Sequence, residues 1–105
     1  MLEQDGWNAI KAGRAQVAAD AFKAAIALDP KNARLHLGAG LAAFLQRRDA
    51  DAKAALEQAL LLDSKLTVAR AQLAQVLRRQ QDFQGAINLY ELVRSEEHTS
   101  ELQSQ

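Results

Sequence analysis

Residues 15–30 read AQVAADAFKAAIALDP, and residues 49–64 read DADAKAALEQALLLDS. The second stretch begins 34 residues after the first and carries small and apolar residues in the same order. A third copy starts at the same interval and then stops. A period of this length is typical of stacked helical hairpins, an architecture that usually provides a binding surface and not a catalytic site. The recurring positions are Gly6, Ala9, Ala18, Phe22, Ala25, Leu28, Asp29 and Pro30, then Gly40, Ala43, Ala52, Leu56, Ala59, Leu62, Asp63 and Ser64, then Leu73, Ala74, Leu77, Ala86, Tyr90 and Val93.

Helix and turn signals divide the chain into segments of about half a repeat each. Gly13 interrupts the first pair, and Pro30 pushes the residue before it out of the helical region, which ends the second helix. Asp49 and Asp82 stand where they can cap the fourth and sixth helices. Because the links are short, neighbouring helices must pack antiparallel. The predicted helices are residues 2–12, 15–28, 33–46, 49–62 and 67–80, and a sixth that follows Asp82.

A longer series of residues repeats in register: Leu2, Asp5, Gly6, Ala9, Ala18, Phe22 and Pro30, then His36, Ala39, Gly40, Ala43, Ala52, Leu56 and Ser64, then Arg70, Leu73, Ala74, Leu77, Ala86 and Tyr90. Over residues 1 to about 93 this series resembles the tetratricopeptide repeat. The resemblance implies an all-α, right-handed superhelix of about three repeats, with six helices. The repeats would span residues 1–32 and 33–66, with a truncated third at residues 67–94. The departures from the family pattern are the first-helix aromatic, here Leu2, His36 or Arg70, and the inter-helix glycine, kept at Gly13 but replaced by Arg47 and Gln81.

The pattern fails from Arg94 onward. The repeat predicts a leucine at position 96 and a proline or small residue at position 98, where the chain has Glu96 and His98. Residues 94–104, RSEEHTSELQS, resemble the in-frame translation of a common sequencing adapter. We therefore expect residues 95–105 to be a non-native tail on a fragment of a longer bacterial protein, and we argue no function from them. The alternative is a natural polar C-terminal tail.

Composition excludes several classes of protein. The absence of cysteine rules out a disulfide framework and a cysteine-based zinc site. A formal net charge of zero gives no electrostatic footprint for nucleic acid. No apolar run is long enough to insert into a membrane, and no signal peptide is visible at the start. The compartment stays open, and the lack of such signals is the one feature that favours the cytoplasm.

The chain carries no recognisable catalytic constellation. His98 lies in the expected tail, and His36 occupies a first-helix packing position, with a role as ligand or base as the alternative. The glycines of Gly38–Gly40 fall inside a predicted helix, so they do not form a phosphate loop. Asp49 and Asp51 begin a helix, where capping and the helix dipole explain them. The sequence predicts no enzyme activity, no metal and no cofactor.

A groove is the remaining candidate site, because the family's first helices line a concave face. The family's usual ligand-facing positions, transferred onto this chain, give a surface that is apolar in the middle and basic at one end. Such a surface suits an amphipathic helix or an extended peptide with apolar anchors and a carboxylate. The alternatives are that the three leucines, Phe44 and Trp7 only pack, and that Arg78 and Arg79 form a solvated face. The implied groove residues are Trp7, Lys11, Arg34, Leu37, Leu41, Phe44, Leu45, Gln75, Arg78 and Arg79, with Glu3, Ile10, Val68 and Ala71 at the other mapped positions.

The family's best-known peptide mode is a basic, asparagine-rich clamp for the C-terminal carboxylate of chaperones. Its positions fall here on Glu3, Trp7, Gly38, Val68 and Gln72, none of which matches.

The sequence therefore predicts a non-catalytic scaffold that binds a protein or peptide through this groove. One alternative is an N-terminal accessory region of a larger bacterial enzyme, because residues 35–48 resemble repeats that precede metallopeptidase-type domains. The other is self-association through an uncapped C-terminal repeat.

Overall fold

The computed structural model describes the backbone of residues 2–104 and the side chains of residues 2–92 and 94. Every element in that part of the chain is a helix, which confirms the predicted all-α repeat architecture. The five fully bounded predictions agree with the observed helices to within one residue at each end. The helices are α1 (Leu2–Lys11), α2 (Ala15–Leu28), α3 (Ala33–Leu45), α4 (Asp49–Leu62), α5 (Thr67–Arg79) and α6 (Phe83–Ser104).

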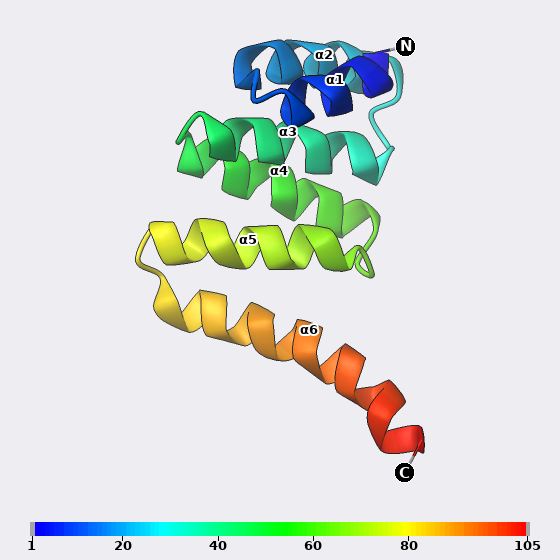
Figure 1. Ribbon diagram of the computed structural model, residues 1–105, viewed down its shortest axis with the longest axis vertical. Helices are drawn as coiled ribbons and strands as arrows, with labels where there is room; N and C mark the ends of the chain where they lie inside the picture. The colour runs from blue at the N-terminus through cyan, green and yellow to red at the C-terminus, as the bar shows by residue number, and fades with distance from the viewer. Residues whose placement is uncertain (1, 105) are drawn as a thin grey trace.

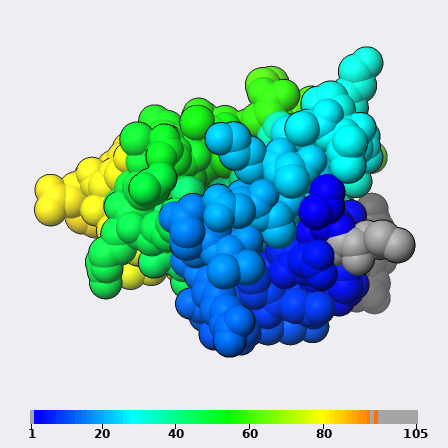
Figure 2. Space-filling view, turned by 90° about the horizontal axis from the view of Figure 1, so that it is seen from above, coloured from blue at the N-terminus to red at the C-terminus, as the bar shows by residue number. Residues whose placement is uncertain are grey.

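The helices stack as the pairs α1/α2, α3/α4 and α5/α6 along the longest axis of the molecule (Figure 1). Each helix packs on its neighbours in sequence, and α3 also contacts both α1 and α5. The three first helices therefore form a continuous row. Seen along the stack, the later pairs emerge to the side of α1 and α2 instead of lying directly beneath them (Figure 2). This offset is the superhelical displacement of a repeat array.

The turn inside each pair uses a left-handed residue at the same place in the period. Gly13 has φ +76°, and the non-glycine residues Arg47 and Gln81 have φ +60° and +68°. Each turn is a Schellman motif, in which the amides of the left-handed residue and of the residue after it donate back to carbonyls in the last turn of the helix. The bond that spans more residues in each turn runs from Arg14 N to Ala9 O (2.8 Å), from Arg48 N to Ala43 O (2.9 Å) and from Asp82 N to Leu77 O (2.7 Å).

The second helices fill the space between successive first helices. Phe22 of α2 and Leu56 of α4 have no exposed surface. A Cβ atom at Gly38 of α3 would lie 2.3 Å from the Phe22 ring, and one at Gly40 would lie 2.7 Å from Leu56 Cγ. Glycine at these positions therefore lets large side chains from the second helices reach the backbone of α3.

One of the two predicted caps is wrong. Arg48 occupies the N-cap position of α4 and makes no side-chain cap bond, while Asp49 is already the first helical residue. The Asp49 carboxylate is drawn instead to Arg79, a charged donor on α5. The other prediction is confirmed, because Asp82 Oδ1 accepts the Gly85 amide proton at 3.0 Å.

The sixth helix continues through the residues that we expect to be a non-native tail. The backbone stays helical to Ser104, and the last turns of α6 extend away from the stack (Figure 1). No proline or glycine follows Gly85 to interrupt the helix. Tyr90, one period after the buried Leu56, is 37% exposed.

Candidate functional site

The predicted groove residues fall into three groups: core, bridging and exposed. Leu37 belongs to the core, where it is 5% exposed and clusters with Leu73 and Leu77. Of the two roles that the sequence left open for Leu37, packing is therefore the one it has. The periodic pattern could not decide this, because it places Leu37 on both the groove side and the helix–helix contact.

A first bridge joins α1 to α3. Trp7 Nε1 donates to Glu3 Oε2 at 3.2 Å, and Arg34 Nε lies 3.6 Å from the same oxygen. The Arg34 guanidinium carbon lies 5.8 Å from the centre of the Trp7 ring, which packs on Phe22 in a T-shaped arrangement with 5.0 Å between ring centres. Trp7 also touches both halves of the core. It therefore has a packing role and still presents a half-buried ring on the row of first helices.

A second bridge joins α5 to α3 and α4 through Arg79. Its Nε donates to Asp49 Oδ1 at 2.8 Å, and its Nη2 donates to the Phe44 carbonyl at 2.7 Å and to Asp49. The guanidinium carbon lies 3.8 Å from the centre of the Phe44 ring. Arg79 is thus neither a free groove cation nor a solvated charge, and its side chain is 26% exposed.

This ion pair changes the acidity of Asp49. The hydrogen bond from Arg79 lowers the pKa of Asp49 below its usual value, and the charges of Arg79 and Arg47 act in the same direction. Partial burial opposes them and has the smaller net effect. Asp49 therefore stays ionised at lower pH than an unpaired aspartate.

The remaining predicted residues are accessible. Lys11, Leu45, Gln75 and Arg78 are exposed, with Leu45 at 49%, whereas Leu41 and Phe44 are half-buried. The structure brings four of the ten predicted residues into one pocket of about 370 Å³, where α3 and α5 end and α6 begins. Its lining residues are Phe44, Gln75, Arg78, Arg79 and Phe83.

Phe83 was missed by the sequence reasoning. It opens a second helix, and the mapped groove used first helices alone. One signal in the sequence could have identified it. An aromatic residue stands at the first position of α6, where the equivalent position one period earlier holds the acidic Asp49. Phe83 is 60% exposed, so its ring adds apolar surface to the pocket.

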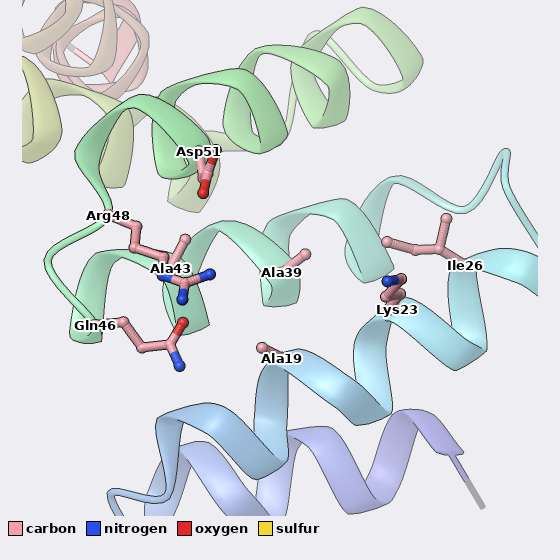
Figure 3. Close-up of a pocket in the computed structure, with 8 residues that line it drawn as sticks. All are labelled: Ala19, Lys23, Ile26, Ala39, Ala43, Gln46, Arg48 and Asp51. Atoms are coloured by element: carbon pink, nitrogen blue, oxygen red, sulfur yellow. The ribbon is translucent and has the colours of Figure 1, made fainter.

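A second hollow lies away from the predicted groove, where α2, α3 and α4 meet (Figure 3). It has a volume of about 280 Å³. Ala19 and Ala39 lie in its middle, with Ala43, Gln46 and Arg48 at one end and Lys23 and Ile26 at the other (Figure 3). None of the ten predicted residues lines it.

We find no catalytic or metal-binding arrangement among the described side chains. His36 Nε2 lies 2.8 Å from the Pro30 carbonyl, so the ring is tied to the turn that precedes α3. Among the described residues, no three histidine or acidic side chains converge as metal ligands. Over the same part of the chain, no helix is both long enough and apolar enough to cross a membrane.

Comparison with solved structures finds the same fold. MamA has 26% identity and a TM-score of 0.86, over 90% of this chain and 55% of that one. The first TPR of Spaghetti (RPAP3) bound to the HSP90 peptide SRMEEVD has 25% identity and a TM-score of 0.85, over 98% and 88%. The first TPR domain of human RPAP3 has 25% identity and a TM-score of 0.87, over 98% and 85%. The chain thus spans little more than half of MamA and most of the two RPAP3 domains.

Comparison with curated proteins gives no match. Nothing in these comparisons supports an accessory region of an enzyme. The family model for the tetratricopeptide repeat matches residues 5–67, which is more than half of the sequence. With the six-helix array and the solved structures that share it, this match shows that the chain belongs to the tetratricopeptide-repeat family.

Proposed function

We propose that the chain is a protein-binding scaffold, without catalysis of its own, that holds a peptide segment along the row α1, α3 and α5. The observation that carries the proposal is the pocket of about 370 Å³, in which Phe44 of α3 and Gln75 and Arg78 of α5 meet. A peptide lying across the row contacts more than one repeat there, as repeat arrays allow.

Exposed apolar side chains extend this surface along the helices. Leu45 near the end of α3 is 49% exposed, and Val68 near the start of α5 is 58% exposed. Trp7 and Leu41 add half-buried apolar surface on α1 and α3. Aromatic and aliphatic anchors of this kind dominate the affinity of peptide interfaces.

A peptide-bound relative supports the proposal, and the residues of this chain at the family's clamp positions indicate which kind of peptide to expect. The first TPR of Spaghetti is bound to an HSP90 peptide. In this chain, Glu3 at the first clamp position already pairs with Trp7 and Arg34, and Gly38 at another is buried against Phe22. We therefore expect this chain to bind a peptide of a different sequence and not to clamp a chaperone C-terminus in this way.

The test is selection of random displayed peptides on the wild-type chain, followed by fluorescence anisotropy with the selected peptides. Leu45→Glu and Val68→Glu each place a charge on the proposed surface. We expect each to weaken binding roughly tenfold or more, because an apolar anchor loses its partner.

Leu61→Glu is the matched control, because Leu61 on α4 is 81% exposed and lies outside the row of first helices. It should leave the affinity unchanged. Equal losses in all three variants, or no selected peptide, would refute the proposed function.

A second candidate is self-association through α6. Phe83, Ile87 and Leu92 are 60%, 47% and 51% exposed, which is unusual for one helix of an isolated domain. The occupant we propose is the α6 of a second copy. The outer face of α1 is polar, with Gln4 Nε2 bonded to Asn8 Oδ1 at 3.1 Å, so head-to-tail stacking on α1 would bury polar groups.

Light scattering at increasing protein concentration tests this candidate. The mass should rise towards that of a dimer, and Ile87→Glu should return it to that of a monomer. Val17→Glu is the control, because Val17 on α2 is 52% exposed. A constant monomer mass for the wild-type chain would rule out self-association and leave the peptide-binding proposal standing.

A further inference from the structure

The pocket at the junction of α3, α5 and α6 has a more specific chemistry than the rest of the row. It combines two phenylalanine rings, Phe44 and Phe83, with two arginines and the amide of Gln75. The inference below rests on the proposed function, because it concerns one end of the same surface.

Arg79 is held in one geometry before any ligand arrives. Asp49 accepts from its Nε, the Phe44 carbonyl accepts from its Nη2, and the Phe44 ring lies beneath the guanidinium. These contacts leave the two Nη1 protons without a partner among the described residues. A guanidinium fixed in this way offers donors to an anion at little entropic cost.

Arg78 supplies the charge that Arg79 alone does not. Asp49 offsets the charge of Arg79, whereas Arg78 is exposed and makes no ion pair in the part of the chain whose side chains are described. The pocket therefore keeps a net positive charge beside the apolar ring of Phe83, which is 60% exposed.

We propose that this pocket captures an acidic side chain of the bound peptide, with an aromatic neighbour of that acidic residue packing on Phe83. The carboxylate receives hydrogen bonds from the Arg79 Nη1 group and from Arg78, and the Gln75 amide lies at the same wall. The site differs from the family's clamp positions, which fall on other residues of this chain.

The test uses two blocked dipeptides that differ in charge and not in shape, acetyl-Asp-Phe-amide and acetyl-Asn-Phe-amide. Each is titrated into the ¹⁵N-labelled chain and followed by NMR. The Asp dipeptide should bind roughly tenfold more tightly than the Asn dipeptide, because a charge-assisted hydrogen bond is replaced by a neutral one. Its shifts should centre on Gln75, Arg78, Arg79 and Phe83.

Arg78→Gln should abolish the preference for the Asp dipeptide, and it removes an exposed side chain that makes no hydrogen bond or ion pair with the described residues. Arg48→Gln, which changes another exposed arginine, at the rim of the other hollow, is the control and should keep the preference. Equal affinity for both dipeptides, or an unchanged preference in Arg78→Gln, would overturn the inference.

The two proposals fail separately. If the wild-type chain selects peptides without enrichment of acidic residues next to aromatic ones, peptide binding stands and the carboxylate site falls. If it selects no peptide, the proposed function falls, while the dipeptide titration still decides whether the pocket recognises a carboxylate.

Discussion

Phe22 owes its complete burial to the glycines that face it from two first helices. Its ring lies against Gly6 of α1 and Gly38 of α3, where added Cβ atoms would approach to 2.7 and 2.3 Å. The ring is enclosed from both sides, so it cannot move away from an added methyl group. The glycines are thus required by a side chain from the other helix of the pair and not by their own backbone conformation.

Gly38→Ala should destabilise the fold by about 1–3 kcal/mol through overpacking, although alanine normally favours a helix interior by roughly 1 kcal/mol over glycine. Urea unfolding measures the free energy. Phe22→Leu in the same chain should recover part of the loss in a double-mutant cycle, because the smaller side chain makes room. A stabilising Gly38→Ala would contradict the packing of Phe22 between α1 and α3.

At the turns with a left-handed residue, glycine is expected to stabilise the fold because of its own backbone conformation. Gln81 has φ +68°, a conformation that costs a side-chain-bearing residue roughly 1–2 kcal/mol. Gln81→Gly should therefore raise stability by about 0.5–1 kcal/mol after the entropy of glycine is deducted. Gly13→Ala, at the first turn of the same kind, should lower the melting temperature. A lower melting temperature for Gln81→Gly would show that its side chain makes an unrecognised contribution.

Among the elements, α5 is held by more than apolar packing. Arg79 links it to the α3 carbonyl of Phe44 and to Asp49 at the start of α4. Three helices therefore meet at one guanidinium, which is also the fixed wall of the proposed carboxylate site. Replacing Arg79 would disturb the array as well as the pocket, whereas Arg78 is available for testing function alone.

The Asp49–Arg79 pair makes stability depend on pH in a defined direction. Because the folded-state pKa of Asp49 is lowered, its contribution is complete above the ordinary value of 3.8 and is lost as the pH falls through the lower folded-state value. Asp49→Asn should destabilise the chain near neutral pH, and the difference from wild type should shrink below pH 3.8. Urea unfolding at both pH values measures it. Asp51→Asn, in the same turn of α4, is the control, and an equal pH effect there would assign the dependence to the helix terminus.

At the scale of the whole molecule, the two ends of the array differ. Gln4 and Asn8 give α1 a polar outer face, whereas one period later Gly38 and Ala42 pack against α2. The α6 end presents exposed apolar residues instead. This asymmetry motivates both candidate interactions of α6.

We propose that residues 95–105 are a non-native tail that the repeat array does not need. A chain ending at Arg94 should keep its cooperative melting, because residues 2–92 already contain the apolar core that packs the three helix pairs together. Circular dichroism should lose only the helical signal of the removed residues, with α6 otherwise intact. Loss of the cooperative transition would show that the tail is structural.

Much of the fold follows from local signals in the sequence. The 34-residue period, the glycine or proline at the turns and the small residues within the helices predicted the first five helices to within one residue at each end. Turn chemistry and helical periodicity act between residues a few positions apart, so they can be read along the chain. The same signals misassigned Asp49 as a cap, because its partner Arg79 lies 30 residues away.

The sequence by itself determined the family, the all-α repeat architecture and the row of first helices that forms the candidate surface. The tertiary structure alone decided which candidate residues remain available: it buried Leu37, engaged Arg79 with Asp49, left Arg78 exposed and brought Phe83 beside Phe44. The physical reason is that exposure and pairing depend on neighbours from other repeats. Periodicity gives the face of one helix, and only the superhelical packing determines what covers that face.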